Sequence, residues 1–194
     1  MKTLSIAVLL MSSILGTVTA EEKVKDKSRS FVVERTINVP AEKVWKVVGE
    51  EFADIAKSHP KLASSHYVEG SPMTGEGCER VCSLNDDGSK YTKEIMVNYN
   101  ALEYSFKAVI NEAGGLPLVP SASYMLYDVD PIDEKTSKIK LKMVYITDPA
   151  FLGGLAKGKF KKTISDYAIA IEHYVLTGED VNPEYFKEIK KQYK

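Results

Sequence analysis

The sequence has little of what defines the specialised classes of protein. With two cysteines and eight prolines in 194 residues, it is neither a disulfide-built scaffold nor a proline-rich disordered chain. The formal net charge is −1 and both signs are mixed along the chain, so no basic field attracts nucleic acid. No apolar run is long enough to span a bilayer. What remains is a chain with 44% hydrophobic residues, enough for the core of one soluble domain.

The short motifs of common catalytic, nucleotide and metal sites are also missing. There is no Gly-x-Ser-x-Gly elbow, no phosphate-binding loop and no Gly-x-Gly-x-x-Gly fingerprint. The histidines His59, His66 and His173 lack metal-ligand spacing, and no Cys-x-x-Cys pair is present. We therefore expect no cofactor and no metal ion, and we interpret the three histidines as structural or surface residues.

Residues 1–20 have the three parts of a secretory signal peptide. A basic start, an apolar stretch over 4–15 and small residues ending at Ala20 precede an abrupt change to charge at Glu21. The alternative, a buried amphipathic helix, is disfavoured because the segment is apolar all round. No cysteine begins the mature chain to carry a lipid. We therefore expect a secreted or periplasmic protein, with residues 21–30 as a flexible leader.

The β-strand signals predict a seven-stranded antiparallel sheet. A segment rich in β-branched residues at 31–39 gives the first strand, and two short helices follow, beginning at Pro40 and near Phe52. From Ser64 onward, turn residues divide some eighty residues into six short strands. The clearest strand, at 138–145, alternates apolar residues with lysines, which is typical of a sheet with one covered face.

One long amphipathic helix is available to cover that sheet. After Pro149, the apolar residues of the segment 160–175 keep to one helix face, and Gly178 ends the helix. A mostly charged tail, 179–194, contains a short helix. Together these elements predict an α+β domain over 31–178, in which a curled sheet grips a helix and leaves space for a ligand between them.

The two cysteines, Cys78 and Cys82, lie in a segment that we interpret as a strand. At this spacing an extended chain separates them by about 13 Å, whereas a disulfide needs Cα atoms within about 7 Å. We therefore predict two free thiols that point inward. Alternation places Arg80 on the same, more apolar face, so Arg80 is expected to point toward the space under the sheet.

Several short motifs stand at the junctions of the predicted elements. They are Ile37-x-Val39-Pro40-Ala41-Glu42-Lys43-Val44-Trp45, Gly70, Gly75-x-Gly77-Cys78-x-Arg80, Asp87-Gly88, Glu94, Leu116-Pro117 before Tyr124, and Tyr145-x-x-Asp148-Pro149. In this order they resemble the START-like, or SRPBCC, superfamily over residues 31–178, and most of all its polyketide cyclase/dehydrase and lipid-transport branch. The resemblance implies a helix-grip fold, with the sheet curled around a long C-terminal helix. It also implies a deep, mostly apolar pocket for lipids, isoprenoids or polyketides, but no single chemistry.

The inner face of the fourth strand is open to two interpretations. Hydrophobicity alone favours Ile95, Val97 and Tyr99, whereas the resemblance favours the alternate set of Thr92, Glu94, Met96 and Asn98. With the second set inside, Glu94 pairs with Arg80 across neighbouring strands, and a buried arginine needs such a partner. The pair is then either an anchor for the polar end of a ligand or a structural ion pair.

Aromatic and methionine side chains supply the expected apolar wall. They occupy matching faces of three predicted strands and of the long helix. The predicted ligand-binding residues are therefore Arg80, Glu94, Tyr104, Phe106, Tyr124, Met143, Tyr145 and Tyr167. The alternative is that these rings fill the core, although a buried tyrosine hydroxyl needs a partner and so favours a pocket.

The sequence favours binding over catalysis, because the inner face offers one carboxylate and no convincing histidine. We expect an exported protein that binds or carries a small hydrophobic molecule, with no nucleic-acid partner. The alternative is a polyketide cyclase or dehydratase in which Arg80, Glu94 and a pocket tyrosine polarise a carbonyl and move protons. A third possibility is a partner-binding module with a filled core. The lysines of 157–162 are interpreted as a solvated face, with transient contact to anionic lipid as the alternative.

Overall fold

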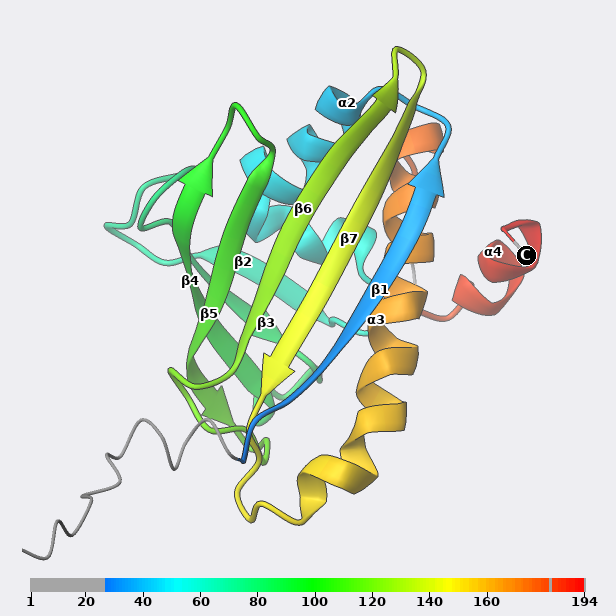
Figure 1. The fold of residues 1–194 in the computed structure, drawn as a ribbon. Helices are drawn as coiled ribbons and strands as arrows, with labels where there is room; N and C mark the ends of the chain where they lie inside the picture. Colours follow the sequence, from blue (N-terminus) through cyan, green and yellow to red (C-terminus); the bar gives the residue numbers. More distant parts are fainter. Residues whose placement is uncertain (1–26, 182, 194) are drawn as a thin grey trace, which may run out of the picture.

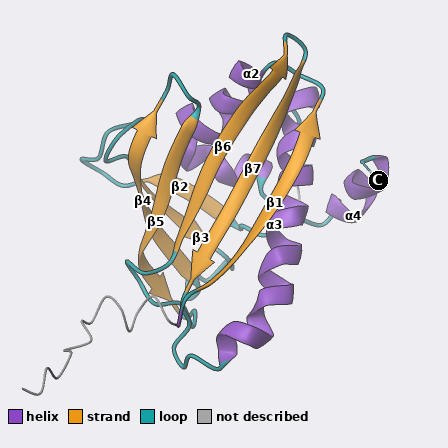
Figure 2. Ribbon diagram, viewed as in Figure 1, coloured by secondary structure: helices purple, strands orange, loops and turns teal. Residues whose placement is uncertain are grey.

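Seven antiparallel strands form one curled sheet, and a long helix lies against its concave face (Figures 1 and 2). The structure is a computed structural model that describes residues 27–193 apart from 182. The expected signal peptide at 1–20 therefore lies outside the described residues, as does most of the expected leader. The α+β helix-grip fold predicted from the sequence is confirmed.

The elements follow one another in the predicted order. In chain order they are β1 (Arg29–Ile37), α2 (Ala41–Trp45), the π-helical turn η1 (Lys46–Glu50), the 3₁₀ helix η2 (Phe52–Ser58), β2 (Ser64–Tyr67), β3 (Glu79–Ser83), β4 (Tyr91–Asn100), β5 (Ser105–Gly114), β6 (Tyr124–Asp133), β7 (Thr136–Tyr145), α3 (Leu152–Thr177) and α4 (Phe186–Gln192). The strand order in the sheet is β1-β7-β6-β5-β4-β3-β2. Strand β1 begins two residues before the expected start of the first strand at residue 31.

Period-two alternation positions the inner face of the sheet. In β7, Ile139, Leu141, Met143 and Tyr145 are buried, whereas the lysines between them are half-buried on the other face.

The predicted free thiols are confirmed, since both cysteines are unpaired and buried.

Helix α3 supplies the covering face. Ile164, Tyr167 and Ile171 lie one turn apart and are buried against the sheet. The helix ends where expected, because Gly178 adopts a left-handed φ of 74° and donates its amide to the Tyr174 carbonyl at 2.8 Å. Within the described residues, no helix is long and apolar enough to cross a membrane.

The tail folds back as α4, away from the sheet (Figure 1). Phe186 of α4 is buried with Ala170 and Val181 in a small second cluster. The Lys190 ammonium forms an ion pair with Asp166, a carboxylate buried on α3. The tail therefore braces the side of α3 that faces away from the sheet.

A bulge near the end of β4 corrects one expectation. The register of β4 against β5 shifts between Val97 and Asn100, and Asn98 takes a positive φ of 55°. Asn98 is consequently exposed, so its predicted inward orientation is wrong, whereas Thr92, Glu94 and Met96 do face inward. The extra residue turns Tyr99 toward the core, with its ring 5.4 Å from that of Trp45.

Candidate functional site

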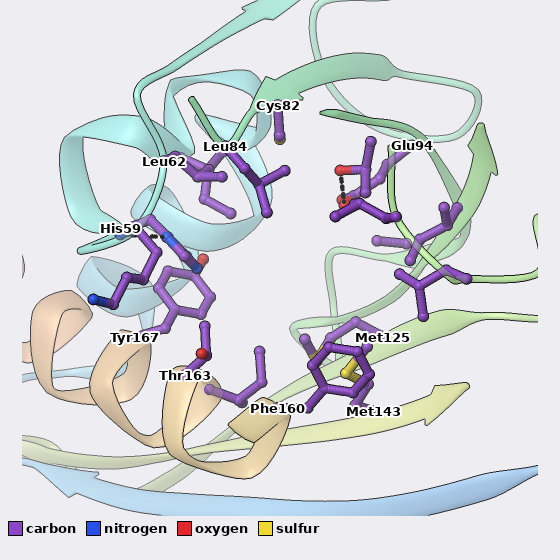
Figure 3. Close-up of a pocket in the computed structure, with 18 of the residues that line it drawn as sticks. His59, Leu62, Cys82, Leu84, Glu94, Met125, Met143, Phe160, Thr163 and Tyr167 are labelled. Atoms are coloured by element: carbon purple, nitrogen blue, oxygen red, sulfur yellow. Dashed lines mark hydrogen bonds between the residues drawn. The ribbon is translucent and has the colours of Figure 1, made fainter. Parts of the chain in front are cut away.

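A cavity of about 190 Å³ lies between the concave face of the sheet and α3 (Figure 3). Most of its wall is apolar and comes from η2, the strands β5 to β7, the loop before β6, and α3. The apolar lining residues include Ile55, Leu62, Ala108, Ile110, Leu116, Leu118, Met125, Met143, Phe160 and Ile164. Lys61, Leu84 and Pro117 also line it and are exposed, so the cavity meets solvent at these residues.

Six of the polar lining side chains form one connected group, which we call the polar cluster. It comprises His59, Arg80, Thr92, Glu94, Tyr127 and Tyr167. These residues come from the segment after η2, from β3, β4 and β6, and from α3, so the fold and not a local motif brings them together. Each member contacts at least one other through a hydrogen bond, an ion pair or a ring contact.

Arg80 and Glu94 form the ion pair expected from the sequence. They lie opposite each other in the β3–β4 register. The carboxylate Oε2 of Glu94 accepts from Arg80 Nε at 2.9 Å and from Nη2 at 2.6 Å. Only 3% of the Arg80 side chain and 14% of the Glu94 side chain are exposed. The predicted pairing is confirmed, whereas its role in ligand binding stays a prediction.

Further contacts complete the pair. Arg80 Nη1 donates to the Phe52 carbonyl at 2.7 Å, and the guanidinium lies 3.8 Å from the centroid of the Phe52 ring. Thr92 donates its hydroxyl to Oε1 of Glu94 at 2.9 Å. Burial by itself lowers the pKa of Arg80, but the Glu94 carboxylate, together with the neighbouring Cys82, Tyr127 and Tyr167, outweighs burial and holds that pKa well above its ordinary value. The guanidinium is therefore charged, and its charge is balanced.

Two tyrosine hydroxyls continue the cluster toward α3. The Tyr127 oxygen accepts from Arg80 Nη2 at 3.5 Å, and the Tyr167 hydroxyl interacts with the Tyr127 hydroxyl. Both residues are 2% exposed. Burial raises the pKa of Tyr127, and it raises the pKa of Tyr167 well above the ordinary value. Both hydroxyls are therefore neutral.

His59 joins the cluster through its ring, which packs 4.7 Å from the ring of Tyr167 (Figure 3). Its Nδ1 accepts the backbone N–H of Lys61 at 3.1 Å. Burial and the nearby Arg80 charge lower the pKa of His59 to about 3. The imidazole is therefore neutral, and the bond to Nδ1 leaves its proton on Nε2. The interpretation of His59 as a structural or surface residue missed its place in the cavity wall.

Five of the eight predicted ligand-binding residues line the cavity: Arg80, Glu94, Tyr124, Met143 and Tyr167. Tyr124 lines the cavity only at its edge. Its ring lies 4.1 Å from the ammonium of Lys107, and Lys107 points to the outer face of β5. On β6 the buried residues are Tyr127 and Val129, which therefore form the inner face of this strand. The sequence had predicted that Tyr124 and Leu126, on the other face, point inward.

The other three predicted residues are absent from the cavity wall. Phe106 stacks behind Tyr127 with ring centroids 4.3 Å apart. Tyr145 donates its hydroxyl to the Gly153 carbonyl at 2.8 Å and so fixes the start of α3. Tyr104 precedes β5 with a φ of 49°, and its ring packs on Trp45. Phe106 and Tyr145 thus fill the core, and Tyr104 packs against it, as the alternative interpretation proposed.

The sequence reasoning also missed Tyr127, although a signal for it exists. Asp128 and Asp130 alternate with Tyr127 and Val129, and acidic residues belong on the solvent face of a half-buried strand.

For metal binding, no cluster of three or more His, Cys, Asp or Glu side chains occurs among the described residues.

Comparisons with known proteins agree with this geometry. Residues 28–168 match the sequence model of the family described as "Polyketide cyclase / dehydrase and lipid transport". No curated protein matches the sequence significantly. The crystal structure of Ara h 8.0201 is similar at 25% identity and a TM-score of 0.60, covering 77% of this chain and 99% of that one.

Two further solved structures share the fold at lower identity. XoxI from Bacillus cereus is 19% identical with a TM-score of 0.58, covering 76% of this chain and 96% of its own. Truncated norcoclaurine synthase from Thalictrum flavum is 16% identical with a TM-score of 0.59, covering 77% of this chain and 94% of its own. One fold therefore hosts differently named proteins, one of them a synthase, so the cavity itself has to indicate what this chain does.

Proposed function

The chain belongs to the polyketide cyclase/dehydrase and lipid transport family, and from that premise we propose that it binds and carries a small hydrophobic molecule in the cavity under the sheet. The observation that carries the proposal is the cavity itself. A sheet and helix that served only as a scaffold would pack to the density of an ordinary core. Here about 190 Å³ remain free behind an apolar wall that includes one polar cluster. This combination is typical of small-molecule sites.

Binding fits the polar cluster better than the alternative of a cyclase or dehydratase. A general acid or base works best when its pKa lies near the operating pH. Burial moves His59 far below that range and both tyrosines above it. The Glu94 carboxylate already accepts three hydrogen bonds from Arg80 and Thr92. No residue is therefore assigned a catalytic role.

The proposal includes export to the periplasm or the cell exterior, as residues 1–20 predict. The two unpaired, buried thiols suit such a location, because a buried thiol is shielded from oxidation. The test is the N-terminal mass of the protein recovered outside the cytoplasm. A start at Glu21 supports export, whereas a chain that retains Met1 in the cytoplasm contradicts it.

Binding is tested with N-phenyl-1-naphthylamine, an uncharged probe whose fluorescence rises in apolar surroundings. We expect saturable binding to the wild-type protein and none to Ala108→Trp, because Ala108 is 1% exposed and lines the cavity. The matched control is Val109→Trp, the next residue of β5, which points to the other face and is expected to keep binding. Far-ultraviolet circular dichroism checks that both variants fold. A wild-type protein that fails to bind the probe overturns the proposal.

A further inference from the structure

The charges of the polar cluster are balanced before any ligand arrives. Both oxygens of Glu94 accept hydrogen bonds, one from two donors of Arg80 and the other from Thr92. A ligand carboxylate or ammonium placed here would add an uncompensated charge to an apolar cavity, which is very costly. The buried polar group of the ligand is therefore uncharged.

The two tyrosine hydroxyls leave one proton without an acceptor. They carry two protons, and at most one of these can lie between the Tyr127 and Tyr167 oxygens. The remaining neighbour of this pair is Arg80, which can only donate. No other described residue bonds to either hydroxyl, so one O–H is left over whichever way the pair is oriented.

His59 provides a second unused donor. Because Nδ1 accepts from Lys61, the neutral ring carries its proton on Nε2. That N–H has no acceptor among the residues that the structure describes. The ring is only 8% exposed, lines the cavity and lies against the ring of Tyr167 (Figure 3). Two donors without protein partners thus meet at one wall of the cavity, where a ligand can satisfy them.

We propose that the buried polar group of the ligand is a carbonyl oxygen, which accepts one hydrogen bond from the tyrosine pair and one from the His59 ring. This inference rests on the proposed function and specifies its ligand. A carbonyl oxygen has two lone pairs and no proton, so it matches two donors without adding a third. The cavity of about 190 Å³ is somewhat larger than one of about 150 Å³ that holds benzene. The ligand is thus a ketone, aldehyde, lactone or quinone whose buried part has one or two rings.

Four naphthalene derivatives that differ only in the polar group test the inference. They are 2-acetonaphthone, 1-(2-naphthyl)ethanol, 2-naphthoate and 2-ethylnaphthalene, each titrated against the bound N-phenyl-1-naphthylamine. We expect the ketone to bind about tenfold more tightly than the hydrocarbon, because it satisfies two buried donors. The alcohol should fall between them, and the carboxylate should bind most weakly.

The double variant Tyr127→Phe/Tyr167→Phe removes both hydroxyls and should abolish most of the ketone preference while the hydrocarbon still binds. Either single variant keeps one free hydroxyl proton and should retain a preference. The control is Tyr174→Phe, two helical turns beyond Tyr167 and outside the cavity wall. If the double variant fails to fold, the wild-type ranking still decides the question.

Each outcome has a separate meaning. Equal binding of ketone and hydrocarbon by the wild-type protein, or tightest binding of the carboxylate, overturns the carbonyl inference and leaves the proposed function standing. A ketone preference that survives the double variant also overturns it. If the probe itself does not bind to the wild-type protein, the proposed function fails.

Discussion

Arg80 and Glu94 face each other across β3 and β4 with Nη2 and Oε2 2.6 Å apart, and each is also held by a partner outside the pair. The Phe52 carbonyl takes one guanidinium donor, and the Thr92 hydroxyl donates to the carboxylate. A buried ion pair with such partners is a fixed structural unit, since moving either side chain leaves a charge unpaired. The ion pair is therefore built on rigid strands and not on loops.

Removing one member of this pair is expected to be severe. Arg80→Ala leaves the Glu94 carboxylate unpaired and should lower the free energy of unfolding by about 3–5 kcal/mol. The double variant Arg80→Met/Glu94→Leu replaces both charged side chains with apolar side chains of similar volume. It should therefore recover much of the lost free energy of unfolding. Urea denaturation measures both. The matched control is Lys93→Ala, which breaks the Lys93–Glu79 pair on the outer face of the same strands and should cost far less. A double variant as unstable as the single one contradicts this account.

The buried His59 predicts a pH dependence of stability. Its folded pKa of about 3 lies below the unfolded value of 6.5, so the unfolded chain binds more protons between these values. Stability is therefore full above pH 6.5 and falls as the pH drops toward 3, by at most about 1.4 kcal/mol per pH unit. The variant His59→Gln should flatten the dependence between pH 6.5 and 5, and His66→Gln, at an exposed site, should leave it unchanged. Parallel curves for wild type and His59→Gln would rule out a buried, neutral His59.

The tail helix should contribute to stability through one side chain in particular. Phe186 is 6% exposed, so Phe186→Ala should lower the free energy of unfolding by about 3 kcal/mol. The adjacent Tyr185 is 63% exposed, and Tyr185→Ala should change it by less than about 0.5 kcal/mol. Thermal and urea unfolding measure the difference. Equal effects of the two substitutions would show that α4 does not dock in solution.

Two glycines should respond to alanine with opposite signs. A Cβ at Gly49 would lie 2.8 Å from the Trp45 ring, so Gly49→Ala should destabilise the fold by about 1–3 kcal/mol. A Cβ at Gly158, within α3, would meet nothing within 4 Å. Gly158→Ala should therefore stabilise the protein by about 0.5–1 kcal/mol through helix propensity. Thermal unfolding of both variants decides this, and a destabilising Gly158→Ala would be the contrary result.

The sequence predicted the fold well because its signals are local. Alternation in β7, the helical period of α3 and the glycine at its end are set by side chains near one another in the chain. The inward position of Glu94 was different, since hydrophobicity favours Ile95 and Val97. It was the family resemblance, and not composition, that placed this carboxylate under the sheet.

The candidate site was harder to predict because tertiary packing assembles it. His59 lines the cavity only because α3, more than a hundred residues later, brings Tyr167 against it. The bulge at Asn98 adds a residue that no alternation pattern shows, and so it moves Tyr99 inward. The acidic residues that alternate with Tyr127 indicate that Tyr127 faces inward. The first residues of β6 are apolar on both faces, however, so alternation there does not show which face is buried.

The position of the single tryptophan has a spectroscopic consequence. Trp45 is 2% exposed and lies against Phe106, which also stacks on the ring of Tyr127 in the cavity wall. Indole emission from the folded protein therefore comes from one shielded site and should shift to longer wavelength on unfolding. Because the stacked rings of Phe106 and Tyr127 connect that indole to the cavity, its intensity offers a label-free optical signal for cavity occupancy as well.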